Sequence, residues 1–402
     1  MLAGFVSLAL GHQHSLIVKQ DGSVWSTGYN EYGQLGDSST VGSFKFVLVS
    51  LGQAKAVAAG NGHSMILMQD GSVCVTGRNM YGQLGLTLRA DTSAFVKVVS
   101  AGAWAVAAGC EHSMVLRQGG GLWATGRNNH GQLGDGTMIS RSHFVLVVSS
   151  GVKAMALGDY HSMVLTQDGA VWATGSNSFG QLGIGLLVEE MVSFYKIVEN
   201  AEAIAAGNLH SLVIRQDGSV WATGRNLFGQ LGDGSTIAKS TFTRVLESGA
   251  KAVTAGHSHS MILKQDGSVW ATGSNVHGQL GDGSTADSYW FAKVVLSDAM
   301  AVAAGFGHSM VVMQDGSVLA TGWNLYGQFG DGSITSTSNF IEVAQLSKRG
   351  IRDAVTFPVH WLPQDLPVIP TAVATGEKRS VLMLSIDVVL YCPFTHFVSI
   401  IN

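Results

Sequence analysis

A repeat constrains this chain more than any other feature of its sequence. A His-Ser pair recurs every 49 residues without insertion or deletion, and its seven histidines are His14, His63, His112, His161, His210, His259 and His308. A fixed period of this size predicts an array in which each unit buries its faces against its neighbours. Because all seven units share the same packing demands, we expect the seven repeated histidines to be structural.

The sixth unit shows what one repeat builds. Its apolar runs, separated by glycine-containing turns, predict strands at 251–255, 259–264, 268–272 and about 290–295. The runs are nearly continuous in hydrophobicity, which indicates that both faces of each sheet are covered. Asp-Gly pairs such as Asp21-Gly22 predict two-residue hairpin turns with positive φ at both residues. Seven units of four short strands predict an all-β, seven-bladed β-propeller of four-stranded antiparallel blades.

The end of the period sets a domain boundary. We predict a seven-repeat propeller over residues 1–347 and a tail over 348–402, which holds all five prolines of the chain. Within the tail, residues 373–381 resemble the start of a partial, degenerate eighth repeat, with Arg379 in the histidine place. One hypothesis is that a strand of this tail adds to the first or last blade and helps to close the ring. The alternative is that the C-terminal end is simply degenerate.

Composition limits the classes of partner. Hydrophobic residues make up 46% of the chain and charged residues 12%, the net charge is -4, and no basic stretch precedes the repeats, so we expect no direct nucleic-acid binding. The cysteines share no spacing motif, which favours free thiols and a cytoplasmic or nuclear location. The apolar stretch 381–401 is interrupted by Asp387, Pro393 and His396, so we expect no membrane anchor.

No catalytic, cofactor-binding or metal-binding motif stands out. The repeated Gly-Gln-Leu-Gly-Asp-Gly segment lacks the lysine of a phosphate loop, and the serines beside the histidines lie in no Gly-x-Ser-x-Gly elbow. The seven histidines lie on different blades, and packed sheets are about 10 Å apart, too far to share one metal ion. We therefore predict no enzyme activity, no cofactor and no metal, and expect each imidazole to bond to backbone groups at its own turn.

The repeat consensus points to a family. The pattern Gly-x-x-His-Ser, followed by Gln-Asp-Gly-Ser-Val-Trp-Ala-Thr-Gly-x-Asn-x-Tyr-Gly-Gln-Leu-Gly-Asp-Gly, resembles the regulator of chromosome condensation repeat family over about 340 residues. The resemblance implies a seven-bladed propeller. It also implies a range of functions, because the family includes an exchange factor for the GTPase Ran, a plant ultraviolet-B photoreceptor and modules of ubiquitin ligases. The tryptophan-containing motifs of the photoreceptor are missing here.

Positions that differ between copies are the best candidates for function, because packing constrains them least. Strands that alternate in direction place the turn after strand one and the loop after strand three on the same face of the ring. Cys110 and Glu111 are among the variable residues there. Aromatic, Arg and Met side chains are enriched in protein interfaces. We predict a partner-binding face comprising Tyr29, Glu31, Arg78, Met80, Arg127, His130, Asp159, Tyr160, Arg225, His257, His277 and Trp323.

These observations predict a non-enzymatic protein-protein interaction scaffold, and we expect a monomer that binds a protein partner. The sequence leaves open the alternative that the variable loops are drifting residues without a function. The competing hypothesis for function is a guanine-nucleotide exchange factor for a small, Ran-like GTPase, which rests on the family resemblance alone.

Overall fold

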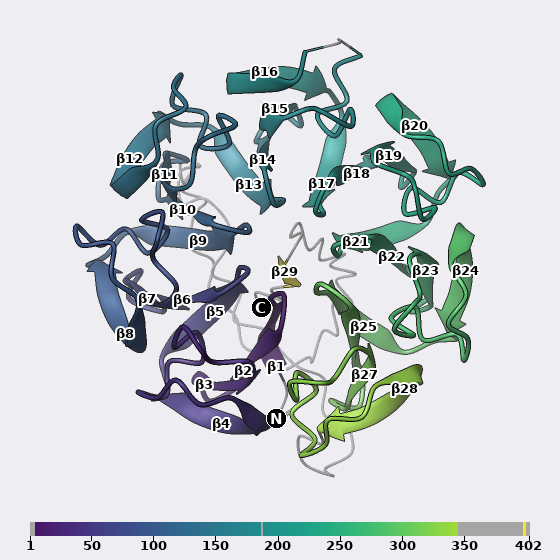
Figure 1. Cartoon of the computed structure of the whole chain (residues 1–402). Coiled ribbons are helices and arrows are strands. Elements are labelled where there is room, and N and C mark those ends of the chain that lie inside the picture. The colour runs from purple at the N-terminus through teal and green to yellow at the C-terminus, as the bar shows by residue number, and fades with distance from the viewer. Residues whose placement is uncertain (1–4, 186–187, 345–396, 399–402) are drawn as a thin grey trace, which may run out of the picture.

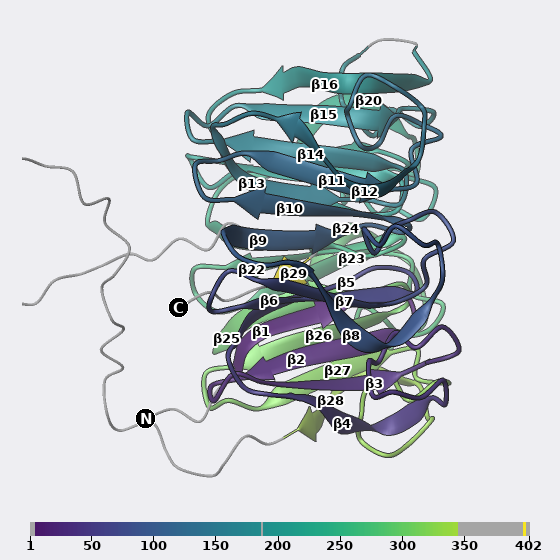
Figure 2. The ribbon, with the colours of Figure 1, turned by 90° about the vertical axis from the view of Figure 1, so that its left-hand side faces the viewer.

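Seven β-sheets surround a central axis in the computed structural model, which describes residues 5–185, 188–344 and 397–398 (Figure 1). Four consecutive strands joined by antiparallel pairing form each blade, with the first of the four towards the axis and the fourth on the outside of the ring. The strands run roughly along the axis, so that the connecting loops gather on two end faces (Figure 2). The predicted all-β, seven-bladed propeller is therefore confirmed.

The strands recur at the same places in every blade. Blade 1 contains β1 (Phe5–Leu10), β2 (His14–Lys19), β3 (Ser23–Gly28) and β4 (Ser43–Leu51). Blade 2 contains β5 (Ala54–Ala59), β6 (His63–Met68), β7 (Val73–Gly77) and β8 (Thr92–Val99). Blade 3 contains β9 (Ala103–Ala108), β10 (His112–Arg117), β11 (Leu122–Gly126) and β12 (Arg141–Val148). Blade 4 contains β13 (Val152–Leu157), β14 (His161–Thr166), β15 (Val171–Ser176) and β16 (Glu190–Val198).

The remaining blades follow the same plan. Blade 5 contains β17 (Ala201–Ala206), β18 (His210–Arg215), β19 (Val220–Gly224) and β20 (Lys239–Leu246). Blade 6 contains β21 (Ala250–Ala255), β22 (His259–Lys264), β23 (Val269–Gly273) and β24 (Ser288–Val295), which match the predicted strands to within two residues at each end. Blade 7 contains β25 (Ala299–Ala304), β26 (His308–Met313), β27 (Val318–Gly322) and β28 (Thr337–Ala344).

Side-chain size decides how the blades converge. The innermost strands are rich in alanine, and pairs such as Ala58 and Ala59 are buried where the blades approach one another. The second strands carry larger residues such as Leu16 and Ile66, which are also buried, because neighbouring sheets cover both of their faces. The outermost strands carry a mixture of exposed and half-buried residues, as expected at the rim.

Glycine in the repeated Gly-Gln-Leu-Gly loop lets one blade press against the next. Gly36 has a φ of +75°, and a Cβ there would lie 2.2 Å from the ring of Phe95 in the following blade. The same contact recurs around the ring, and its phenylalanines are Phe46, Phe95, Phe144, Phe194, Phe242, Phe291 and Phe340. The loop therefore serves as an inter-blade contact.

The repeated His-Ser pairs link neighbouring blades. His63 Nε2 lies 2.9 Å from Ser113 Oγ of the next blade, and Ser113 Oγ donates a hydrogen bond of 2.7 Å to the Gln83 carbonyl. Because the hydroxyl has one hydrogen and donates it to the carbonyl, Nε2 of the imidazole must be the donor to Ser113. The seven pairs, which we call the relay and whose imidazoles belong to the relay histidines, have equivalent His-Ser distances of 2.8–3.2 Å. The imidazole was expected to bond to backbone groups at its own turn, but the partner of His63 Nε2 is a side chain 50 residues away in sequence.

Burial keeps three of the relay histidines neutral. Desolvation lowers the pKa of these three, His14, His63 and His308, to about 3. A neutral imidazole has one N–H, which the relay places on Nε2. The seven His-Ser contacts thus form a closed circle of hydrogen bonds between blades.

The Asp-Gly hairpins differ from the prediction. Gly22 N donates to the Lys19 carbonyl, so the central residues of the turn are Gln20 and Asp21, and of the Asp-Gly pair only Gly22 has a positive φ. This is a three-residue loop, in which a turn is followed by a glycine in the left-handed region. The expected two-residue turn was wrong, because an Asp-Gly pair is compatible with both loop lengths.

The ring closes between blades 7 and 1 with the contacts used elsewhere. His308 Nε2 lies 3.2 Å from Ser15 Oγ, and Ser15 Oγ donates to the Gln328 carbonyl at 2.7 Å. A short strand β29 (Phe397–Val398) pairs antiparallel with β1, so the first sheet has five strands. The predicted eighth-repeat echo at 373–381 lies outside the described residues.

Candidate partner-binding face

The turns and loops of one end face form concentric circles of equivalent repeat positions. The innermost circle comes from the turns between the first and second strands, and its members are His12, Asn61, Cys110, Asp159, Asn208, His257 and Phe306. The next circle follows the third strands, with Tyr29, Arg78, Arg127, Ser176, Arg225, Ser274 and Trp323. Aromatic or imidazole rings form a third circle, with Tyr32, Tyr81, His130, Phe179, Phe228, His277 and Tyr326.

The innermost circle lines a cavity on the axis. The cavity has a volume of about 30 Å³, and every blade contributes to its wall. This volume holds about two water molecules. Glycine permits the close convergence of the turns, since a Cβ at Gly60 would lie 2.4 Å from the Gly109 carbonyl oxygen of the next blade.

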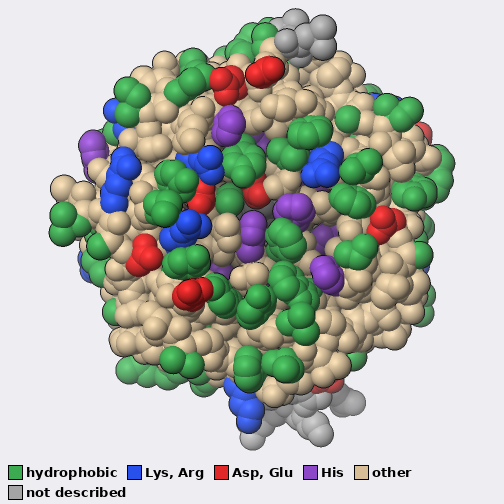
Figure 3. All heavy atoms as spheres, in the orientation of Figure 1, with side chains coloured by type: hydrophobic (Ala, Val, Ile, Leu, Met, Phe, Trp, Pro, Cys, Tyr) green, Lys and Arg blue, Asp and Glu red, His purple; other side chains and the backbone are tan. Residues whose placement is uncertain are grey.

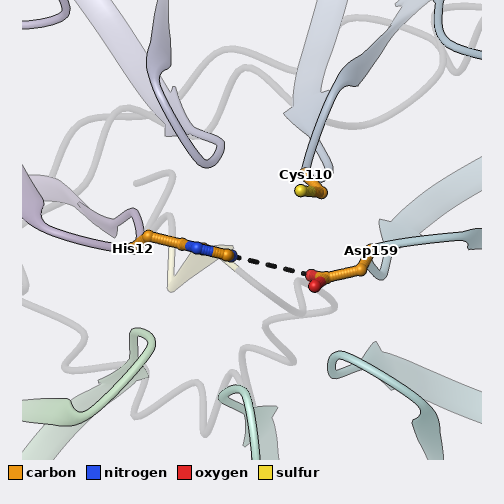
Figure 4. A group of neighbouring side chains, drawn as sticks. All are labelled: His12, Cys110 and Asp159. Atoms are coloured by element: carbon orange, nitrogen blue, oxygen red, sulfur yellow. Dashed lines mark ion pairs between the residues drawn. The ribbon is translucent and has the colours of Figure 1, made fainter.

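Three side chains of different chemistry point into this cavity from blades 1, 3 and 4. They are His12, Cys110 and Asp159, and one ligand atom of each lies within 4.8 Å of those of the other two (Figure 4). His12 Nε2 is 3.8 Å from Asp159 Oδ1, too long for a direct hydrogen bond. Asn208 donates a hydrogen bond to the other carboxylate oxygen of Asp159, and Asn61 Nδ2 lies 3.5 Å from Cys110 Sγ.

The pKa values of the carboxylate and the thiol in the cavity are shifted in opposite directions. Burial alone would raise the pKa of Asp159, but His12, His257 and the amide of Asn208 outweigh burial and hold that pKa below its usual range. Burial, with the nearby carboxylates of Asp159 and Glu111, raises the pKa of the Cys110 thiol well above its usual value. The cavity therefore contains a carboxylate and a neutral thiol at neutral pH.

A cluster of charges covers blades 2 and 3. Glu111 is buried between two guanidinium groups, with 2.8 Å from its carboxylate to Arg127 and 3.1 Å to Arg78. Each guanidinium also lies over aromatic rings, Arg78 over Tyr32 and Arg127 over the rings of Tyr81 and Tyr160. With two guanidinium groups and one carboxylate, the cluster carries one net positive charge.

Aromatic rings cover blades 6, 7 and 1. His277 stacks on Trp323 with ring centroids 5.3 Å apart, and Tyr326 joins Trp323 to Tyr29 through two edge contacts of 5.5 and 5.1 Å. Phe306 connects this group to the axis, since its ring centroid lies 4.3 Å from that of His257. The aromatic groups form one continuous surface from the rim of the cavity outward.

Aliphatic side chains stand beyond these rings. They occupy the repeat position of Glu31, and their exposed fractions are Met80 54%, Leu227 58%, Val276 60% and Leu325 58%. Figure 3 shows this face, where hydrophobic side chains gather over one part and Lys, Arg, Asp and Glu side chains over another, with histidines near the centre. The face thus combines a charged sector with an apolar, aromatic sector.

The structure places the twelve predicted residues on this one face, in the turns and loops that the strand alternation requires. Glu31 accepts a hydrogen bond from Tyr29, and His130 Nδ1 lies 3.3 Å from Glu190 Oε2, while the His130 ring makes an edge contact with Tyr160. The predicted set of twelve omitted nine residues that complete the face, namely His12, Asn208, Phe306, Tyr326, Leu227, Val276 and Leu325, together with Cys110 and Glu111, which the sequence marked only as variable. All nine occupy repeat positions of residues already considered, so comparison of equivalent positions could have found them.

The fold, the repeat and this loop face define the class of protein. The chain belongs to the RCC1-like domain family, because the RCC1-like domain matches residues 97–390, more than half of its length. The regulator of chromosome condensation (RCC1) repeat also matches residues 5–34, 54–83 and 21–67. The family resemblance seen in the repeat consensus is thereby confirmed.

Solved structures share the same fold. Human WBSCR16 matches with 22% identity and a TM-score of 0.71, over 78% of this chain and 87% of that chain. Prp20p from Saccharomyces cerevisiae matches with 24% identity and a TM-score of 0.67, over 75% and 80% of the two chains. Yeast RCC1 (Prp20) in complex with Kap60 matches with 19% identity and a TM-score of 0.73, over 86% of each chain.

Two further comparisons are negative. Curated protein sequences gave no significant match to this chain. Among the described residues, none belongs to a helix with the length and hydropathy required to cross a bilayer.

Proposed function

We propose that this chain is a non-enzymatic protein-binding scaffold, located in the cytoplasm or nucleus, whose partner docks on the loop face. The single observation that supports the proposal most is the partition of that face into two sectors held by the same rigid ring. Trp323 and the exposed aliphatic residues suit apolar partner side chains, while the arginines suit carboxylates.

The charges on the face are not all neutralised internally. Arg78 and Arg127 share the single carboxylate of Glu111. Arg225 lies over the rings of Phe179 and Phe228, and no ion pair joins it to another of the described residues. A partner segment with acidic and apolar residues would complement both sectors. The relatives also support a protein partner, since Prp20 is described as binding Gsp1p and histones and as bound to Kap60.

A matched pair of triple variants tests the face. The test variant replaces Arg127, Tyr160 and Trp323 with alanine. The control replaces the same residue types on outer strands, through Tyr195→Ala, Arg244→Ala and Trp290→Ala. We expect affinity capture from the source cell to lose specific partners with the test variant and to retain them with the control. Full retention with the folded test variant would show that this face is not the binding surface.

Exchange of guanine nucleotide on a small GTPase is the second candidate function. It is favoured by the structural likeness to Prp20, whose structure is described together with binding to Gsp1p. Release of a fluorescent GDP from a panel of small GTPases measures it directly. Acceleration above the rate in buffer, lost in the triple face variant, would assign exchange to the loop face, whereas no acceleration across the panel favours the scaffold.

A further inference from the structure

The axial cavity combines three residue types that are also metal ligands. His12, Cys110 and Asp159 offer a nitrogen, a sulfur and an oxygen, with all pairs of ligand atoms within 4.8 Å. Four-coordinate zinc binds imidazole nitrogen and carboxylate oxygen at about 2.0–2.2 Å and thiolate sulfur at about 2.3 Å, which places neighbouring ligand atoms roughly 3.5 Å apart. The 3.8 Å between His12 Nε2 and Asp159 Oδ1 is close to this separation.

The surroundings of the three side chains fit such a site. Cys110 is buried and lines the cavity, so an ion in the cavity would lie beside its sulfur atom. Asn61 contacts the sulfur, and Asn208 donates to the carboxylate oxygen of Asp159 that does not face His12. The His12 ring is held by Phe306, with centroids 5.1 Å apart. Such supporting contacts orient the ligands of protein metal sites.

We propose that His12, Cys110 and Asp159 form a site for a divalent transition-metal ion of zinc type on the propeller axis. Binding of the ion releases the Cys110 thiol proton to solvent, so that sulfur binds as the thiolate. The mixed donor set selects the metal, because magnesium and calcium prefer oxygen ligands alone and copper(I) prefers sulfur ligands. A fourth ligand would come from the cavity, which His257 also lines. This site departs from the prediction of no metal, which considered the seven relay histidines and not the residues two positions before them.

Cobalt(II) is the probe for the test, because it replaces zinc in tetrahedral sites and shows a thiolate charge-transfer band when sulfur is a ligand. The full chain, freed of metal with a chelator, is titrated with Co²⁺ and then with Zn²⁺. We expect one Co²⁺ per chain, the charge-transfer band, and loss of the band as Zn²⁺ displaces the cobalt. Absence of the band in the wild-type chain would overturn the proposal.

Cysteine variants locate the sulfur ligand. The chain has three cysteines, so a Cys74→Ser/Cys392→Ser variant retains Cys110 as its single thiol. We expect this control to keep the band and the affinity, and Cys110→Ser to lose the band. A band that persists in Cys110→Ser, or disappears in the control while the control remains folded, would contradict the assignment.

Two further variants keep the thiol and remove the other ligands. His12→Gln and Asp159→Asn should each weaken Zn²⁺ binding by roughly 100-fold or more, while Asn61→Ala, which removes a supporting contact, should weaken it roughly 10-fold. Unchanged affinity in both ligand variants would overturn the site.

Thermal stability gives an independent measurement. An ion bound to the native ring and not to the unfolded chain raises the melting temperature, and this ion would join blades 1, 3 and 4. We expect Zn²⁺ to raise the melting temperature of the wild-type chain and of the Cys74→Ser/Cys392→Ser control, and to leave that of Cys110→Ser unchanged. Equal shifts in all three would refute the proposed site.

Discussion

Ser113→Ala tests the hydrogen-bonded circle that joins the blades. The substitution removes a buried hydroxyl that accepts from His63 Nε2 at 2.9 Å and donates to the Gln83 carbonyl at 2.7 Å. The imidazole N–H and the carbonyl both lose their partner, and the space left by one oxygen atom is too small for water. Each buried group left unpaired costs about 1–3 kcal/mol, so we expect a loss of about 2–6 kcal/mol in the free energy of unfolding.

Guanidinium chloride denaturation, followed by tryptophan fluorescence and circular dichroism, measures this loss. The matched control is Ser100→Ala, at an exposed position outside the strands, where we expect a change within about 0.5 kcal/mol. A second variant, His63→Phe, allows a double-mutant cycle with Ser113→Ala. Because both substitutions break the same hydrogen bond between His63 and Ser113, the double variant should lose less stability than the sum of the losses in the two single variants.

The result that refutes this reasoning is a stability of Ser113→Ala equal to that of Ser100→Ala. In that case the hydroxyl would contribute no net stabilisation, and the inter-blade circle would be a geometric consequence of packing alone. Strict additivity of the His63 and Ser113 variants would also contradict the shared bond.

Three further predictions concern pH, the axial glycines and the charged sector. In the folded state the pKa values of His14, His63 and His308 are about 3, below the ordinary value of 6.5. The stabilisation of the folded state by these neutral imidazoles is therefore complete above pH 6.5 and declines as the pH falls towards 3. Between pH 7 and pH 5 we expect a loss of roughly 2 kcal/mol in the free energy of unfolding for each of the three histidines. Denaturation at both pH values measures this loss, and a flat profile would contradict it. Gly109→Ala should destabilise by about 1–3 kcal/mol, because its Cβ would lie 2.3 Å from a buried imidazole carbon, whereas Gly121→Ala, with its nearest atom at 3.2 Å, should cost less in the same denaturation assay. Glu111→Gln, which leaves two guanidinium groups without their carboxylate, should lower stability by about 2 kcal/mol, and a melting temperature equal to that of the wild type would show that the ion pairs contribute nothing.

The repeat period made the architecture predictable. An ungapped spacing of 49 residues requires seven equivalent units, and the four apolar runs of each unit leave few alternatives to a four-stranded blade. Local details of the loops were harder to predict from the sequence. The Asp21-Gly22 pair is compatible with two loop lengths, and only the hydrogen bond from Gly22 N to the Lys19 carbonyl distinguishes them.

Contacts between blades could not be predicted from one unit. The bond of His63 reaches Ser113 in the next repeat, because the blades are wedge-shaped and their second strands face one another near the axis. Reading one strand in isolation suggests a local partner, since nothing in the local sequence indicates how closely the neighbouring strand approaches. The same limit applies to Glu111, whose two arginine partners come from different blades.

Ring closure explains how residues far apart in sequence become one site. Cys110 and Asp159 are 49 residues apart and His12 is 98 residues from Cys110, yet all three occupy the same position of their repeats. The axis brings equivalent positions of the inner turns together, so that any ligand types placed there become neighbours. Because the relay histidines and axial glycines hold every turn in the same geometry, a substitution at the inner position can change the chemistry of the cavity while leaving the ring intact. The copies must therefore be compared position by position, and a mixed set such as histidine, cysteine and aspartate at one inner position is the signal to seek in other chains of this repeat.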